Sequence, residues 1–132
     1  MVSGKELLKW LILKTITPRL QQKLRCLYLA RRVVSKQGYR EPEIEVLENL
    51  VRAGSAVADI GANAGVYTFE FSSLVGPDGR VYAFEPISEN FEILQAVISK
   101  AHLSNVTSFG AALGSIPSQR EMVIPALLGF TG

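Results

Sequence analysis

The sequence predicts an α/β fold built on a mostly parallel β-sheet, and three observations support this. Short apolar runs with the composition of buried strands occur at 56–60, 80–84 and 105–109. Segments with the apolar periodicity of helices fill the intervals between them. Glycine-rich and proline-rich turns separate the segments. Strands that alternate with helices of this length are typical of parallel sheets joined by right-handed crossovers.

The N-terminal part of the chain, residues 1–40, is predicted to be helical. Two helices are expected, over 5–16 and 19–34, separated at Thr17-Pro18 because proline can start a helix but not continue one. One side of the second helix is apolar and the other polar. The apolar side holds Leu20, Leu24, Leu27, Ala30 and Val34, and the polar side Gln21, Arg25 and Arg32. The pattern predicts a helix that rests on its own domain or, alternatively, on a membrane surface; nucleic acid is disfavoured because aromatic residues are not interleaved.

The net charge of +2 conceals a strong asymmetry along the chain. Residues 1–40 hold ten Lys and Arg and one acidic residue, whereas residues 41–132 hold four Lys and Arg and eleven acidic residues. The sequence therefore divides into a basic helical segment, 1–40, and an acidic domain, 41–132.

Hydropathy and cysteine content predict a cytoplasmic protein. Lysine and arginine interrupt the most apolar N-terminal stretch, so neither a membrane span nor a signal peptide is expected. The single cysteine, Cys26, cannot form an intrachain disulfide and is expected to be a structural or idle thiol. Peripheral membrane contact through residues 1–40 stays open.

The elements of the domain follow one another closely. A helix over 43–51 is expected to end at a cap formed by Gly54. The strand at 56–60 leads into a helix over 66–75, which the turn Gly76-Pro77-Asp78-Gly79 closes before the strand at 80–84.

The next helix, over 88–101, is expected to be capped by Ser88 and to lead to the strand at 105–109. Beyond it, only a short strand over 121–124 is suggested. Three strands leave one sheet edge unpaired, which predicts that the chain is the N-terminal part of a larger fold.

A glycine loop, Asp59-Ile60-Gly61-Ala62-Asn63-Ala64-Gly65, follows the strand at 56–60 and is the predicted cofactor cradle. Gly61 and Gly65 allow backbone angles closed to other residues and let a ligand approach the main chain. A dinucleotide-binding fingerprint would need a second glycine where Asn63 stands. Asn63 itself is either a turn residue or a ligand contact.

Two carboxylates favour S-adenosylmethionine as the ligand. Asp59 would repel a pyrophosphate but suits the sulfonium and ammonium groups of this cofactor. Glu85, which ends the strand at 80–84 and precedes Pro86, can accept hydrogen bonds from both ribose hydroxyls. The alternative is that Asp59 only caps a helix and that Glu85 is solvated. The predicted cofactor-binding residues are Asp59, Gly61, Ala62, Asn63, Gly65, Glu85 and Pro86.

The segment VADIGANAGVYTFEFSSLVGPDGRVYAFEPISENFEIL is similar to the opening of FkbM-type methyltransferases. The similarity runs from about residue 41 to residue 125 and includes Tyr67-Thr68, Asn90-Phe91 and Asn105-Val106. It implies a class I Rossmann-like fold, of which 41–132 would be an incomplete domain, and S-adenosylmethionine-dependent methyl transfer. The implied acceptor is a hydroxyl of a sugar, glycan or small natural product.

The resemblance assigns no catalytic residue. The family's later strands, which would supply acceptor contacts and a base, have no counterpart here, and the loop at 110–114 departs from the family pattern. His102 is expected to be an exposed or capping residue, and one cysteine with one histidine predicts no metal site. The alternatives are a cofactor-binding module without turnover and an NAD(P)-dependent oxidoreductase, which would need the missing glycine pattern.

Overall fold

The computed structural model describes residues 17–35, 43–119 and 121–122, and its elements follow the expected β-α-β-α-β order. The elements are α2 (Pro18–Val34), α3 (Glu43–Leu50), β1 (Ala56–Ile60), α4 (Val66–Val75), β2 (Arg80–Phe84), α5 (Ser88–Lys100) and β3 (Val106–Phe109). The helix expected over 5–16 lies outside the described residues. Of the strand expected over 121–124, residues 121 and 122 are described and are not in a strand.

The three strands form one parallel sheet in the order β1-β2-β3, which confirms the predicted fold class. Ile60 pairs with Phe84 across β1 and β2, and Phe84 pairs with Phe109 across β2 and β3. Within the described residues β1 pairs with β2 alone, so its other edge is open, as the sequence predicts.

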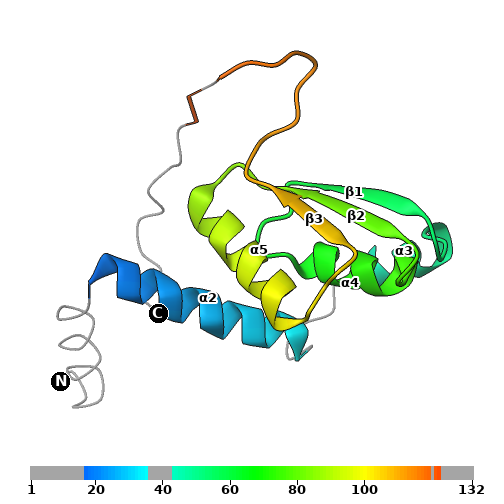
Figure 1. The fold of residues 1–132 in the computed structure, drawn as a ribbon, viewed down its shortest axis with the longest axis horizontal. Helices are drawn as coiled ribbons and strands as arrows, with labels where there is room; N and C mark the ends of the chain where they lie inside the picture. Colours follow the sequence, from blue (N-terminus) through cyan, green and yellow to red (C-terminus); the bar gives the residue numbers. More distant parts are fainter. Residues whose placement is uncertain (1–16, 36–42, 120, 123–132) are drawn as a thin grey trace.

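Helices cover one face of this sheet. Figure 1 shows α4 and α5 in a layer beneath the strands and α2 outside that layer, farther from the sheet. Val81 and Ala83 are fully buried beneath β2, and Leu94 of α5 packs with Ala83 in the core. On the opposite face Ile60 and Tyr82 are exposed. The helical face therefore supplies the core within the described residues.

Asn105 joins the end of α4 to the start of β3. Its side-chain nitrogen donates to the backbone oxygens of Ser72, at 2.9 Å, and Gly76, at 2.8 Å. The hydroxyl of Ser72 donates to the Asn105 side-chain oxygen at 2.6 Å. Two carbonyls at the end of α4, which also accept from the N–H groups of Gly76 and Gly79, thus gain a second, buried partner.

Two predicted helix caps are wrong. Gly54 lies beyond the end of α3 at Leu50, and its N–H donates to the backbone oxygen of Val75 at 2.7 Å in the approach to β1. Ser88 is the first residue of α5 rather than its cap, because Ile87 occupies the cap position. The N–H of Ile87 donates a hydrogen bond to the Glu85 carboxylate at 2.8 Å. The partner of Gly54 lies on another element, whereas the Glu85 carboxylate lies only two residues before Ile87.

Helix α2 begins where the sequence predicts, with Pro18 in its first turn and Thr17 as its N-cap. It packs on its own domain, against α5, but through a different side than expected. The buried residues are Cys26 and Ala30, whereas Leu24 is half exposed. The predicted apolar side is therefore confirmed at Ala30 and wrong for Leu20, Leu24 and Leu27, which are 43%, 50% and 59% exposed.

We expect Asn105→Ala to lower the free energy of unfolding by about 2 kcal/mol. The substitution removes three hydrogen bonds and leaves two carbonyls at the end of α4 without their buried partner. Urea denaturation followed by circular dichroism measures the change. The control is Asn49→Ala on α3, where one exposed hydrogen bond to the Glu45 oxygen is lost. Equal losses for the two variants would contradict the bracing role of Asn105.

Candidate cofactor site

The predicted site lies where β1 and β2 end side by side. Because Asp59 pairs with Ala83 and Ile60 with Phe84, Asp59 and Glu85 come from the carboxyl ends of neighbouring strands. Ligands of open parallel sheets bind at this edge. The structure thus brings together the two carboxylates that the sequence singles out.

The glycine loop folds back over the end of β2. The N–H groups of Gly61 and Ala62 both donate to the Phe84 oxygen at 2.9 Å. Gly61 has a φ of 83°, and a Cβ built on it would meet nothing within 4 Å. The backbone at this position is therefore bare and has open space above it, as a ligand cradle requires.

Gly65 has a different task. It precedes α4 with a φ of 82°, and a Cβ there would lie 2.9 Å from Leu94 Cδ1. A side chain would force α4 and α5 apart, so this glycine is needed for the packing of the corner. Of the two predicted glycines, Gly61 faces open space and Gly65 faces the core.

Between these glycines, Ala62 and Asn63 shape the loop. Ala62 is buried in the core with Ala83 and Leu94, so its methyl group points away from the cradle. Asn63 has a φ of 50°, and its N–H donates to Glu85. The structure supports the turn-residue interpretation of Asn63, whose side chain is exposed.

Glu85 is buried, with 4% of its surface exposed, and connects two loops. Its Oε2 accepts from the Asn63 N–H and its Oε1 from the Ile87 N–H, both at 2.8 Å. The solvated alternative is therefore wrong for this carboxylate. Each oxygen can accept a second hydrogen bond, so capacity for ligand hydroxyls remains. Pro86, half-buried, fixes the backbone between Glu85 and Ile87.

Asp59 is also buried, and its partner is neutral. The Thr68 hydroxyl donates to its Oδ2 at 2.5 Å. Burial raises the pKa of the Asp59 carboxyl, the hydrogen bond from Thr68 opposes that rise, and the Glu85 charge adds to it. Thr68 is the third residue of α4, so Asp59 does hold the first turn of this helix, as the capping alternative proposed.

Thr68 was not predicted as the partner of Asp59. The two residues are nine positions apart, on a strand and a helix, and only the folded loop brings them together. One sequence signal could have indicated this contact. Thr68 lies in the first turn of the predicted helix, on the side that faces the end of the strand at 56–60.

The cysteine and the histidine lie elsewhere. Cys26 is buried between α2 and α5, and burial together with the Glu92 charge raises the pKa of its thiol. His102 is exposed, with a φ of 53°, directly after the cap of α5. Its N–H donates to Ser99, and that of Leu103 to Ile98, the hydrogen bonds of a Schellman helix end. Neither residue belongs to the glycine loop.

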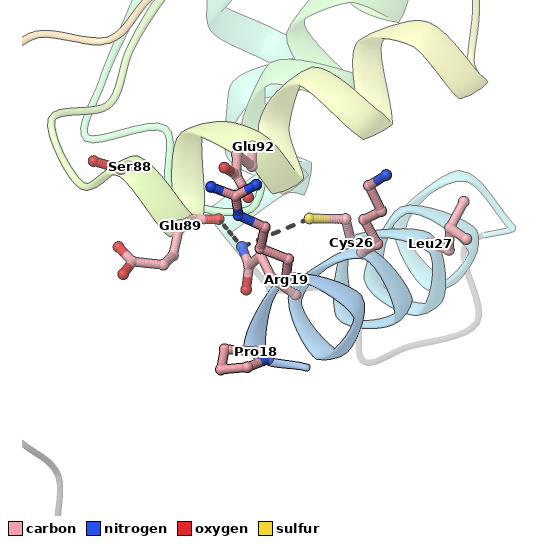
Figure 2. Close-up of a pocket in the computed structure, with 9 residues that line it drawn as sticks. Pro18, Arg19, Cys26, Leu27, Ser88, Glu89 and Glu92 are labelled. Atoms are coloured by element: carbon pink, nitrogen blue, oxygen red, sulfur yellow. Dashed lines mark hydrogen bonds between the residues drawn. The ribbon is translucent and has the colours of Figure 1, made fainter. Parts of the chain in front are cut away.

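A separate cavity of about 840 Å³ lies between the first turns of α2 and α5 (Figure 2). Its lining includes basic side chains from α2, Arg19 and Lys23, and acidic side chains from α5, Glu89 and Glu92. Gln22 joins the two helices through a 3.0 Å hydrogen bond to the Glu89 backbone oxygen. The mixed charge of this cavity gives it no clear preference for an anion or a cation.

Comparison with solved structures places this arrangement among known folds. An S-adenosylmethionine-dependent methyltransferase from Aquifex aeolicus is 31% identical, with 55% of this chain and 39% of that protein aligned and a TM-score of 0.51. An S-adenosylmethionine-dependent O-methyltransferase from Thermotoga maritima is 20% identical, with 63% and 34% aligned and a TM-score of 0.52. The fold is that of class I methyltransferases.

These alignments leave the finer assignment open. The chain spans less than two fifths of the length of either protein. No family model and no curated protein sequence matches it. The similarity to the FkbM family therefore stays a prediction.

The raised pKa of Asp59 predicts a pH-dependent effect of Asp59→Asn. A carboxyl whose pKa is higher in the folded state stabilises the fold below its unfolded pKa of about 3.9, and this contribution is lost as the pH rises through the folded pKa. The melting temperature of Asp59→Asn minus that of the wild type should therefore increase between about pH 4 and pH 7.

Thermal denaturation across this pH range measures that difference. The matched control is Asp78→Asn, the same substitution in the exposed turn before β2. A difference for Asp59→Asn that shrinks as the pH rises would contradict a raised pKa.

Proposed function

We propose that the protein forms the S-adenosylmethionine-binding part of a class I methyltransferase. The observation that carries this proposal is the pair of buried carboxylates, Asp59 and Glu85, beside the open space over Gly61. The two acids match two different parts of one ligand: a cationic amino-acid end and a ribose with two hydroxyls. The 31% identity to the Aquifex aeolicus methyltransferase supports the same ligand.

The surroundings of Asp59 favour a cationic ligand. A buried carboxylate with a neutral partner and a raised pKa carries an electrostatic cost that a cation can remove. S-adenosylmethionine carries a sulfonium and an ammonium group, and either charge near Asp59 would lower that cost. A pyrophosphate would increase it, which argues against a dinucleotide ligand.

Glu85 is suited to hold the ribose. The backbone N–H groups of Asn63 and Ile87 fix the orientation of its carboxylate, so little side-chain entropy is lost when a ligand binds. Its remaining acceptor positions can take hydroxyl donors. Among the predicted residues, Pro86 and the Gly61 backbone would line the same space.

The acceptor is proposed from the FkbM resemblance: a hydroxyl of a sugar, glycan or small natural product. The cofactor supplies the methyl group, and the residues of this chain bind and orient it for in-line attack. Asp59 and Glu85 are engaged in binding, so we assign no catalytic base. A cytoplasmic location, with peripheral membrane contact through residues 1–40, fits such a protein.

The second candidate is a cofactor-binding module without turnover. Glu85 already accepts a backbone N–H group, and Asp59 already accepts the Thr68 hydroxyl. These hydrogen bonds favour the module, because they leave no acid among the described residues of the site to accept a proton. Methyl transfer from labelled cofactor to a panel of hydroxylated acceptors separates the two candidates, since the module would bind the cofactor and transfer nothing.

Calorimetric titration with S-adenosylhomocysteine tests the shared claim. We expect the wild type to bind it and not NAD. Glu85→Gln should weaken binding by about tenfold or more, because hydrogen bonds to a charged group are worth roughly 1.5–3 kcal/mol. Asp59→Asn should weaken S-adenosylmethionine more than uncharged analogues that lack the sulfonium.

Glu89→Gln is the matched control, since this exposed glutamate on α5 uses only its backbone oxygen in the hydrogen bond to Gln22. It should bind the ligand as the wild type does. Circular dichroism confirms that each variant is folded. A folded wild-type chain that binds NAD but not S-adenosylhomocysteine would reject the proposed function.

A further inference from the structure

The outer side of α2 carries an apolar stripe, made of four large side chains that the domain leaves uncovered. Its residues are Leu20, Leu24, Leu27 and Tyr28, which are 43%, 50%, 59% and 60% exposed. Their spacing along the helix places them on one side, with Leu27 at its margin, where it also lines the cavity between α2 and α5. The residues that pack toward α5, Cys26 and Ala30, lie on the other.

Only basic residues carry the charge of α2. The helix holds Arg19, Lys23, Arg25, Arg31 and Arg32 and no aspartate or glutamate. Arg19 and Lys23 line the same cavity as the acidic Glu89 and Glu92 of α5. The positive charge near the stripe comes from the other three, and the Arg32 guanidinium lies 5.9 Å from the centre of the Tyr28 ring.

We propose that α2 docks the protein on an anionic phospholipid surface, with the stripe turned toward the lipid. Leucine and tyrosine side chains would enter the interface between headgroups and acyl chains, and the arginines would reach the phosphates. The position of α2 in the outermost layer, away from the sheet, leaves this side accessible (Figure 1).

Charge complementarity decides between this partner and the other candidates. A second copy of this chain would bring the same arginines together, and like charges repel. Nucleic acid would use the arginines but gain nothing from three exposed leucines. An anionic membrane uses both features. The sequence at 1–16 adds leucines, isoleucines, Trp10 and three lysines with one glutamate, which is the same chemistry.

Docking through α2 involves none of the residues of the glycine loop. The stripe belongs to 20–28, whereas the cofactor residues belong to 59–65 and 85–86. Vesicle binding can therefore be measured without cofactor, and its failure says nothing about S-adenosylmethionine binding.

The test is co-sedimentation of the full chain with vesicles of phosphatidylcholine alone or with about one third phosphatidylserine. We expect binding to the anionic vesicles, little binding to neutral ones, and release at high salt. Leu24→Gln/Leu27→Gln should weaken binding by about tenfold or more. Arg25→Gln/Arg31→Gln should weaken it by about fivefold for each charge removed.

Val46→Gln/Leu50→Gln is the matched control, because these two apolar residues are 58% and 69% exposed on one side of α3, one helical turn apart. It should bind vesicles as the wild type does. Circular dichroism checks that all variants fold, and the arginine variant tests the proposal should the leucine variant fail to do so.

Three outcomes would overturn the proposal. The first is a wild type that ignores anionic vesicles. The second is unchanged binding by both α2 variants, which would assign the contact to residues 1–16. The third is a dimer, seen by light scattering, that the leucine variant dissociates while vesicles have no effect; the stripe would then serve self-association.

Discussion

The Glu85 carboxylate is the interaction on which the rest of the site depends. It accepts backbone N–H groups from Asn63, in the loop after β1, and from Ile87, in the turn after β2. Two connections that are independent in the sequence are thereby held at one place. Buried charge-assisted hydrogen bonds of this kind are strong and directional, so the position of one loop determines that of the other.

In this arrangement, some acceptor positions of the Glu85 carboxylate support the loops and the others are available to bind a ligand. The lone pairs that hold Asn63 and Ile87 form the scaffold, and those that remain are available to a ligand. Asp59 follows the same principle, since Thr68 in the first turn of α4 occupies its Oδ2. A site whose acids are already oriented by the backbone loses less entropy on binding than one whose acids must be ordered by the ligand.

The sequence predicted the strands and most helix limits well because their signals are local. The run Ala56–Ile60 is apolar and bounded by glycines, and the turn over 76–79 has the residues that turns require. The two carboxylates were also found, because a parallel sheet brings the ends of its strands to one edge. What could be predicted followed from periodicity, turn chemistry and topology.

Most of what failed depended on contacts between distant parts of the chain. Gly54 donates to Val75 of α4 instead of capping α3. Thr68 was missed for the same reason. The cap of α5 moved by one residue, to Ile87, whose N–H donates to Glu85 two residues earlier in the same turn. A local motif indicates which hydrogen bonds a residue can make. Which of these bonds forms depends on the partners that the fold brings close to the residue.

The orientation of α2 is the clearest example of a tertiary contact that outweighs a local sequence pattern. A helical wheel favours burial of the leucines, but the side that packs on α5 carries the small residues Cys26 and Ala30. Small side chains let two helices approach closely, and the Gln22 side chain then reaches the Glu89 backbone at 3.0 Å. Rotation of the leucines inward would separate the helices and break this hydrogen bond. Close packing thus leaves the larger apolar side chains outside, and exposed leucines beside arginines are costly in water unless another surface covers them.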